Sequence, residues 1–180
     1  MSEEIEEASA RSGAKRRRER AVSKSRGTPA TVALTGAGIA FTLHEYDHDP
    51  RAGGYGLEAA TALGLEPDQV FKTLLADLDG SLVVAVVPVS GMLDLKALAR
   101  ALGGSRAAMA DPKAAERATG YVTGGISPIG QKRTHRTVVD ESALLYDVVY
   151  VSAGRRGLDL GIAPADLVEV TGAISADVSR

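Results

Sequence analysis

Two features of the sequence could do chemistry together: a lysine inside an apolar run, and a loop rich in glycine. Lys72 lies within residues 70–75, where a strand would bury hydrocarbon, and residues 124–132 carry three glycines. A half-buried ammonium and a loop of exposed backbone N–H groups can hold an electron-rich carbonyl or a phosphate ester. The combination therefore indicates a pocket for such a group.

Each feature also has a purely structural interpretation. On a strand, Lys72 would share a face with Val70 and Leu74, and a lysine there either extends to solvent or points into a cavity. Gly124 and Gly125 either let a ligand approach the main chain or only form a tight turn. The spacing alone leaves both alternatives open.

Familiar catalytic motifs are absent or lack their structural context. The glycine loop is neither G-x-G-x-x-G nor a P-loop, and Ser127 lies between Ile126 and Pro128 rather than in a G-x-S-x-G turn. Residues 44–48 match H-E-x-x-H, but that motif binds zinc from a helix, and this segment alternates like a strand and runs into Pro50. The sequence has no cysteine. We therefore expect no metal site, and if the chain is an enzyme, its nucleophile need not come from the protein.

A few polar residues near predicted strand ends could contact a ligand. The carboxylate of Asp159 and the hydroxyl of Tyr46 could each orient a substrate amine. Arg155 and Arg156 lie at the tip of the turn that follows Ser152, where arginines either hold phosphate or only solvate the turn.

The composition is that of one soluble globular domain. The chain has 180 residues, of which 44% are hydrophobic and 24% charged. No apolar run approaches the ~20 residues that cross a bilayer, and the acidic N-terminus lacks the apolar core of a secretory signal. Because cysteine is absent as well, we expect a cytoplasmic protein that needs no cofactor and binds no membrane.

Charge is distributed unevenly along the chain. Residues 1–27 carry eight Lys or Arg and five Asp or Glu, a net +3, which leaves −5 for residues 28–180 because the whole chain is −2. We expect 1–27 to be a disordered basic tail and 28–180 to be the folded domain. The tail either binds nucleic acid or is only a solvated extension.

Short strands and helices must position the candidate residues. The cap signals Thr28-Pro29 and Asp111-Pro112 and the turn signal Asp79-Gly80 divide the chain clearly. We expect helices at 29–36, 57–63, 94–102, 111–118 and from 164, and strands at 39–46, 70–78, 82–89, 121–123, 138–139, 148–152 and 158–162. Because these elements do not alternate as βαβ units, we predict an α/β fold with a mixed, mostly antiparallel, barrel-like sheet flanked by short helices.

Nine short motifs, in order from residue 28 to the C-terminus, resemble the YbaK family of free-standing bacterial deacylases. They lie at 28–30, 46–50, 70–74, 86–89, 93–96, 109–112, 119–121, 124–132 and 156–159. The resemblance implies the fold shared with prolyl-tRNA synthetase editing domains. It also implies an enzyme that clears Cys-tRNA(Pro) in translation quality control, and that acts on other Cys-tRNAs such as Cys-tRNA(Cys) and works beside prolyl-tRNA synthetase. In this family the cysteinyl thiol is thought to attack its own ester carbonyl, which agrees with the missing protein nucleophile.

The resemblance also assigns roles to particular residues. Lys72 matches the family's essential lysine, which holds the terminal adenosine phosphate or the ester, and Gly124 and Gly125 match the loop whose amides contact the aminoacyl carbonyl. The substrate-binding residues that it implies are Tyr46, Thr73, Ile126, Ser127, Ser152 and Asp159.

Two other functions remain open at this point. The chain could be a hydrolase that edits Ala-tRNA(Pro) with water as the nucleophile, or a non-catalytic module that binds tRNA or a synthetase. The basic tail has no counterpart in the family, and the match is loose after Asp159.

Overall fold

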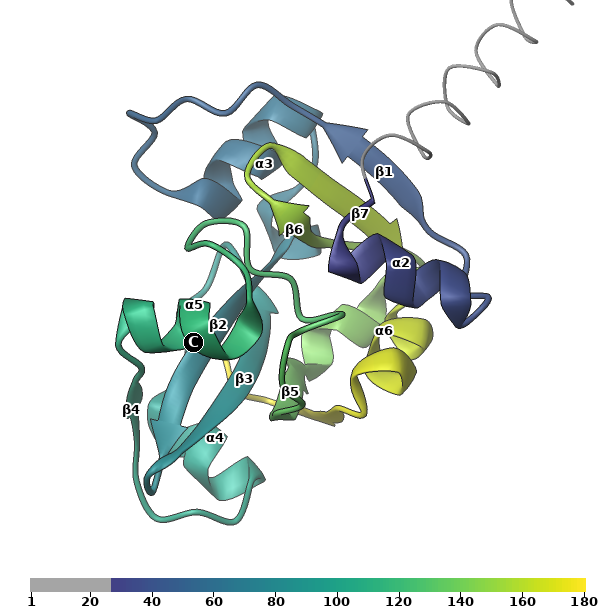
Figure 1. Ribbon diagram of the computed structural model, residues 1–180. Helices are drawn as coiled ribbons and strands as arrows, with labels where there is room; N and C mark the ends of the chain where they lie inside the picture. Colours follow the sequence, from purple (N-terminus) through teal and green to yellow (C-terminus); the bar gives the residue numbers. More distant parts are fainter. Residues whose placement is uncertain (1–26) are drawn as a thin grey trace, which may run out of the picture.

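Two β-sheets form the centre of the fold in the computed structural model, which describes residues 27–180 (Figure 1). The smaller sheet has the strand order β1-β7-β6 and the larger one β4-β2-β3-β5-β8. The strands of the smaller sheet are β1 (Thr42–Glu45), β7 (Leu158–Ile162) and β6 (Val149–Arg155). Those of the larger sheet are β4 (Ala107–Met109), β2 (Phe71–Leu78), β3 (Ser81–Pro88), β5 (Arg136–Asp140) and β8 (Ile174–Ala176).

Short helices cover the sheets. They are α2 (Pro29–Gly36), α3 (Tyr55–Leu63), α4 (Leu95–Ala101), α5 (Pro112–Thr119) and α6 (Pro164–Thr171), with 3-10 turns at Pro67–Gln69 and Glu141–Leu145. Thr28 caps α2 through a reciprocal pair of hydrogen bonds with Thr31, and the carboxylates of Asp94 and Asp111 cap α4 and α5. The predicted boundary at residue 28 therefore coincides with a helix cap, whereas the predicted tail falls largely outside the described residues.

The β2–β3 hairpin is the best-specified part of the larger sheet. Asp79 and Gly80 both have positive φ, 51° and 92°, which gives the tight turn the twist that a two-residue hairpin needs. Strand β3 is buried on both faces, because Val84 and Val86 pack into one hydrophobic cluster and Val83 into the other. The predicted hairpin and the central place of β3 are confirmed.

The two sheets meet at a single parallel bridge between Val70 and Tyr150. Four of the six strand pairs are antiparallel, and the β3–β5 and β5–β8 pairs are parallel. The mixed, mostly antiparallel α/β fold is confirmed, although its strands form two open sheets that meet at this bridge and not one closed barrel. Beyond the bridge, β2 and β6 are no longer paired, which leaves a gap between the sheets.

Several predicted elements differ from those observed. Residues 121–123 do not form the predicted strand. A side chain holds this segment instead of strand pairing: the hydroxyl of buried Tyr121 donates to the carbonyl oxygen of Ile129. Strand β1 is shorter than predicted, and α3 begins two residues earlier, at Tyr55. The three-residue strands β4 and β8 were not predicted, since such short strands are defined by distant partners.

No helix within residues 27–180 is both long enough and apolar enough to cross a membrane.

Candidate active site

A cavity of about 370 Å³ opens at the gap between the two sheets. Its wall is built from β2, the starts of α3 and α5, the end of β4, the glycine loop, Ser152 of β6 and Asp159 of β7. Seven of the nine residues that the sequence nominated line it: Tyr46, Lys72, Thr73, Gly124, Ile126, Ser152 and Asp159. Residues from distant parts of the chain therefore line one cavity.

Lys72 lies half-buried in the wall of this cavity. Its Nζ donates a hydrogen bond of 2.7 Å to the carbonyl oxygen of Gly91, and burial lowers the pKa of its ammonium. The close packing of α3 helps to fix it: a Cβ on Gly56 would lie 2.3 Å from Cγ1 of Val89 and 4.0 Å from Cβ of Lys72. Lys72 thus lines a cavity, with its ammonium bonded to Gly91, and does not simply extend to solvent.

Thr73 presents an unused hydroxyl. Its Oγ1 is buried without a hydrogen-bond partner, one of only two such side-chain atoms in the described part of the chain. The main-chain hydrogen bonds of β2 show which way the peptide groups of Thr73 point. The carbonyl oxygen of Val70 accepts from the amide of Val89, just after β3, and that of Leu75 accepts from the amide of Ala110 on the opposite side. Because strand amides alternate in direction, the peptide groups of Thr73 point away from β3, toward the gap. Buried polar groups normally have partners, so the hydroxyl of Thr73 is an exception among the described residues.

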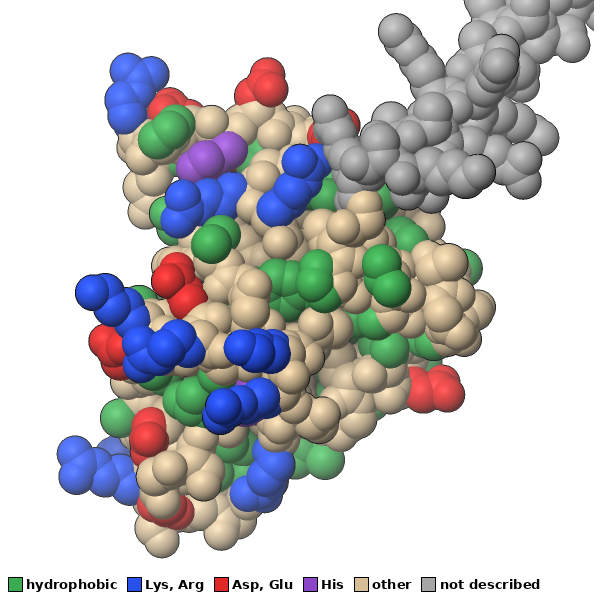
Figure 2. All heavy atoms as spheres, in the orientation of Figure 1, with side chains coloured by type: hydrophobic (Ala, Val, Ile, Leu, Met, Phe, Trp, Pro, Cys, Tyr) green, Lys and Arg blue, Asp and Glu red, His purple; other side chains and the backbone are tan. Residues whose placement is uncertain are grey.

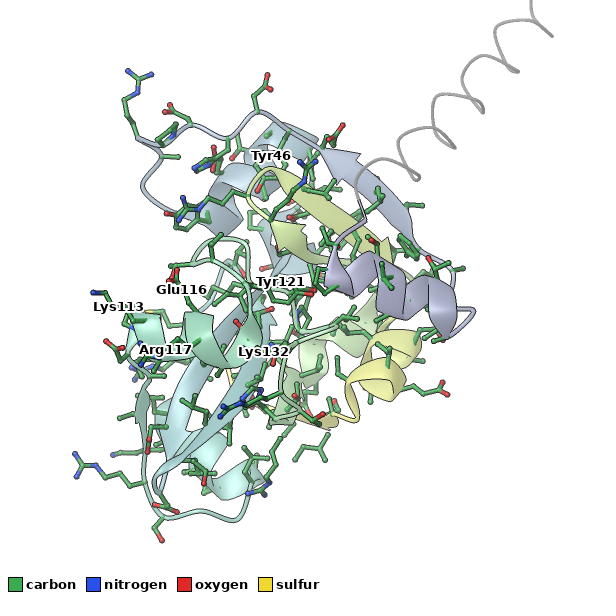
Figure 3. All side chains as sticks on the ribbon, viewed as in Figure 1. Tyr46, Lys113, Glu116, Arg117, Tyr121 and Lys132 are labelled. Carbon is green, nitrogen blue, oxygen red and sulfur yellow. The ribbon has the colours of Figure 1, made fainter. Side chains whose placement is uncertain are left out.

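Asp159 and Tyr46 form the polar end of the cavity. Asp159 is only 5% exposed, and burial raises the pKa of its carboxyl to about 6. Burial, reinforced by the charges of Asp159 and Glu58, raises the pKa of the Tyr46 hydroxyl to about 12. At neutral pH the cavity therefore holds a carboxylate next to a protonated phenol, a suitable pair for a substrate ammonium group. Figure 3 shows Tyr46 beside β7, the strand that carries Asp159.

A serine, a histidine and an aspartate lie in one row across the smaller sheet without forming a catalytic triad. In the strand register, Asp159 lies opposite Ser152 on β6 and His44 on β1. However, Nε2 of His44 is 2.8 Å from Oγ1 of Thr42, and no hydrogen bond among the described residues joins the histidine to the other two. A serine nucleophile needs a bonded base, so this row does not supply one.

The glycine loop contributes less of its main chain than predicted. Gly124 lines the cavity with φ at +84°, and its amide has no partner among residues 27–180. Gly125 and Ser127 do not line it, which corrects the expectation for both. The Gly125 amide donates to the carbonyl oxygen of Val122 at 2.9 Å, and a Cβ there would lie 2.8 Å from the Arg155 main chain. Ser127 is fully buried, and its Oγ accepts from the amide of Ile129.

Tyr55 lines the cavity and is 39% exposed, so it lies at the cavity mouth, and Arg156 packs over its ring. The sequence did not nominate Tyr55. The Arg156 guanidinium lies 5.2 Å from the centre of the Tyr55 ring, and its Nε donates to the carbonyl oxygen of Thr123 at 2.8 Å. A Cβ on Gly124 would lie 2.6 Å from the same ring. An isolated tyrosine after a glycine-rich loop was the available signal, but only the fold brings it to the site.

The H-E-x-x-H residues have other partners. Nδ1 of His48 lies 2.9 Å from Oε2 of Glu58 on α3, whereas His44 lies on β1 against the edge of the Tyr150 ring. Within residues 27–180, no group of three or more His, Asp or Glu side chains could hold a metal ion. The two histidines are separated because one ends a strand and the other begins a loop.

Comparison with known proteins gives a consistent result. The profile of the aminoacyl-tRNA editing domain family matches residues 55–170. EbsC of Enterococcus faecalis, provisionally named a Cys-tRNA(Pro)/Cys-tRNA(Cys) deacylase, is 40% identical over 122 residues, which cover 67% of this chain and 74% of EbsC. The proline–tRNA ligase of Moorella thermoacetica is 36% identical over 73 residues, which cover 41% of this chain and 13% of the ligase.

A solved structure shares the fold. It is described as a provisional trans-editing enzyme for prolyl-tRNA synthetase, and it superposes with a TM-score of 0.76 and 28% sequence identity. The superposition covers 87% of this chain and 99% of that one.

Proposed function

Because the chain belongs to the aminoacyl-tRNA editing domain family, we propose that it is a deacylase that removes cysteine from mischarged Cys-tRNA(Pro), and also acts on Cys-tRNA(Cys). Prolyl-tRNA synthetase is the enzyme whose errors it would correct. A synthetase pocket cannot strongly reject an amino acid of similar size, so a second enzyme has to remove the wrong product.

One observation carries the proposal: the cavity combines a placed cation, a free hydroxyl and a buried carboxylate, but no nucleophile with a bonded base. Lys72, Thr73 and Asp159 supply those three groups. Such a site can hold and polarise an aminoacyl ester, and it suits a substrate that carries its own nucleophile. Cysteine is that substrate, because its thiolate is a strong nucleophile.

The reaction follows from this arrangement. The cysteinyl sulfur attacks the ester carbonyl carbon of its own aminoacyl group, a carbon–sulfur bond forms, and the ester carbon–oxygen bond breaks. The thiol proton passes to the ribose oxygen that leaves. The products are tRNA with a free terminal hydroxyl and a four-membered thiolactone, which water opens to cysteine. Intramolecular attack gains from the high effective concentration of the thiol.

The residues of the cavity would hold this substrate in place. The Lys72 ammonium stabilises the charge that develops on the carbonyl oxygen or holds the terminal adenosine phosphate, and the Gly124 amide donates to the same carbonyl. Asp159 and Tyr46 bind the α-ammonium group, and Thr73 bonds the ester or the ribose. A volume of about 370 Å³ lies at the small end of ligand pockets. It suits the aminoacyl group and its ribose, while the rest of the tRNA stays outside.

Deacylation of a panel of charged tRNA(Pro) tests the proposal. Cys-tRNA(Pro) should be cleaved far faster than Ser-tRNA(Pro), which differs by one atom and carries a poorer nucleophile. The rate on Cys-tRNA(Pro) should rise with pH toward the thiol pKa of ~8.5. Correctly charged Pro-tRNA(Pro) should be spared.

Other outcomes distinguish the alternatives. Equal rates on the cysteinyl and seryl substrates would mean that water attacks, and preferred cleavage of Ala-tRNA(Pro) would make the chain an alanine-editing hydrolase. Binding of tRNA without cleavage of any ester would leave a non-catalytic module.

A further inference from the structure

A row of exposed basic side chains follows helix α5 (Figures 2 and 3). Lys113 and Arg117 lie four residues apart and therefore on one face of the helix, and both are exposed. Lys132 continues the row: its amide donates to the carbonyl oxygen of Thr119, and its Cβ would be 3.4 Å from a Cβ on Gly120. We call Lys113, Arg117 and Lys132 the α5 basic surface.

The α5 basic surface is continuous with the cavity. Pro112 and Ala115 of the same helix line the cavity, and Lys113 directly follows Pro112. One short helix thus presents apolar residues to the proposed substrate pocket and cations to solvent beside it. A ligand that leaves the cavity on this side passes along the row.

The cations of this surface are available to a ligand. Among the described residues, none of the three takes part in a salt bridge. The neighbouring acidic side chains are engaged with the main chain: Glu116 accepts the amide of Thr123 at 2.7 Å, and Asp111 accepts that of Ala114 at 2.9 Å. Neither carboxylate forms a salt bridge with the row among the described residues, although the pKa of Glu116 is lowered by its hydrogen bond with Thr123 and, to a smaller extent, by the charge of Lys113.

We propose that the α5 basic surface binds the phosphates of the acceptor arm of the tRNA whose terminal aminoacyl group occupies the cavity. This inference rests on the proposed function for its ligand. Residues 28–180 carry a net charge of −5, so most of the domain repels RNA, and a polyanion can approach only where cations gather. Phosphate contacts fix the position of a nucleic acid without reading its sequence, which is what delivery of a common 3′ end requires.

Helix α4 provides a matched control surface. Lys96, Arg100 and Arg106 are also three exposed cations, and they line a separate cavity between α4 and β4. Helix α4 packs into the hydrophobic cluster that contains Val83, whereas α5 packs into the one that contains Val84 and Val86. The control thus removes the same charge from a different part of the surface.

Binding of uncharged tRNA(Pro) by the full chain, titrated over a range of salt concentrations, tests the inference. The variant K113Q/R117Q/K132Q should bind on the order of tenfold more weakly at low salt. Its log–log salt slope should be smaller by about two to three, because each lost phosphate contact removes about 0.7–0.9 from the slope. The variant K96Q/R100Q/R106Q should keep the parent affinity and slope, and thermal melting should show that both variants are folded.

A competition experiment identifies the bound part of the tRNA. An acceptor-stem minihelix with the common 3′ end should displace the tRNA from the parent chain at lower concentration than an anticodon stem–loop of equal length, because only the minihelix can also place its end in the cavity. Equal weakening by the two triple variants, no weakening by the α5 variant, or equal competition by the two RNA fragments would each overturn the inference. The tRNA in this experiment carries no amino acid, and only binding is measured. Failure of the deacylation assay would therefore leave this result intact, and failure of the binding test would leave the deacylation result intact.

Discussion

At the scale of single residues, three polar side chains of the candidate site, those of Asp159, Lys72 and Thr73, have no side-chain partner among the described residues. Asp159 takes part in no salt bridge among the described residues, and burial alone raises its pKa. The ammonium of Lys72 bonds a carbonyl oxygen, and the hydroxyl of Thr73 has no partner within residues 27–180. Each group therefore costs stability in the free protein and is available to a substrate. Substitutions here should separate stability from activity.

Lys72→Ala should reduce kcat/KM on Cys-tRNA(Pro) by ~10²–10³, the usual effect of removing a donor that stabilises developing charge. The fold should persist, because the half-buried ammonium makes only one hydrogen bond within the described residues, to Gly91. Lys96→Ala, on the exposed face of α4, is the control and should leave the rate unchanged. Near-parental turnover in Lys72→Ala would remove this lysine from the mechanism.

Asp159→Asn should stabilise the fold at high pH. The pKa is raised from 3.8 to about 6 in the folded state, so ionisation favours the unfolded chain. The cost is absent well below pH 3.8, grows as the pH rises, and is complete above pH 6. At ~1.4 kcal/mol per pKa unit it reaches about 3 kcal/mol. The variant should therefore exceed the parent in free energy of unfolding at pH 8, and this advantage should shrink toward pH 4.

Urea unfolding of parent and variant at pH 4, 6 and 8 measures this difference. A difference that does not change with pH would show that the substitution acts through packing and not through the charge of Asp159. At pH 7 the same variant should raise KM for the aminoacyl substrate, because the amine loses its carboxylate.

Thr73→Val should raise KM while leaving stability equal or higher. It replaces a buried hydroxyl that has no partner with a methyl group of similar shape, and such a hydroxyl costs ~1–3 kcal/mol. Thr137→Val is the matched control: its buried hydroxyl on β5 donates to the carbonyl oxygen of His135, so this change should destabilise by about 1 kcal/mol. Equal loss of stability in the two variants would contradict the assignment of Thr73.

At the scale of elements, the glycine loop and helix α3 depend on each other. Gly124 has positive φ, and its missing side chain leaves room for the ring of Tyr55, the first residue of α3. Arg156, from the β6–β7 turn, covers that ring and bonds the loop at Thr123. Three elements that are distant in sequence thus meet at the cavity mouth, and one added methyl group should separate them.

Gly124→Ala should cost more stability than Gly38→Ala and should also reduce activity. Both positions have positive φ, so both alanines incur ~1–2 kcal/mol of backbone strain. A Cβ on Gly38 meets nothing within 4 Å, whereas one on Gly124 would lie 2.6 Å from the Tyr55 ring. Thermal melting and deacylation assays of the two variants measure the effect of this contact. Equal behaviour would mean that the ring moves aside without consequence.

At the scale of the whole molecule, the distribution of charge separates delivery of the tRNA from its chemistry. Residues 1–27 are net +3, and residues 28–180 are net −5. The candidate catalytic residues all lie in the second part, and Lys72 and Gly124 line a cavity of about 370 Å³ there. Cations outside the cavity should therefore affect binding and not turnover.

A chain that starts at Thr28 should bind tRNA with a shallower salt dependence than the full chain, because it lacks the eight basic residues of the first 27. Turnover at saturating tRNA should be the same for both. Parallel salt titrations with single-turnover assays measure the two quantities. Identical slopes would show that the basic segment does not contact the RNA.

The sequence alone determined the features that depend on neighbouring residues. The cap residues Thr28 and Asp111 begin their helices where predicted, Asp79-Gly80 turns the hairpin, and the apolar run of β3 is central. Such signals are local, because caps and tight turns satisfy backbone groups a few residues away. The absence of cysteine and the order of the motifs likewise limit the chemistry, since neither depends on how the chain folds.

Only the tertiary structure decided which of the nominated residues share a cavity. It directed Lys72 and Thr73 to the gap beside β6, and placed Ser127 and Gly125 behind the wall. It also brought Tyr55 to the mouth. These outcomes depend on contacts between segments far apart in sequence, and a loop's composition does not say which of its amides are used within the loop. The side of a strand or loop that meets a ligand is set by what packs against the other side.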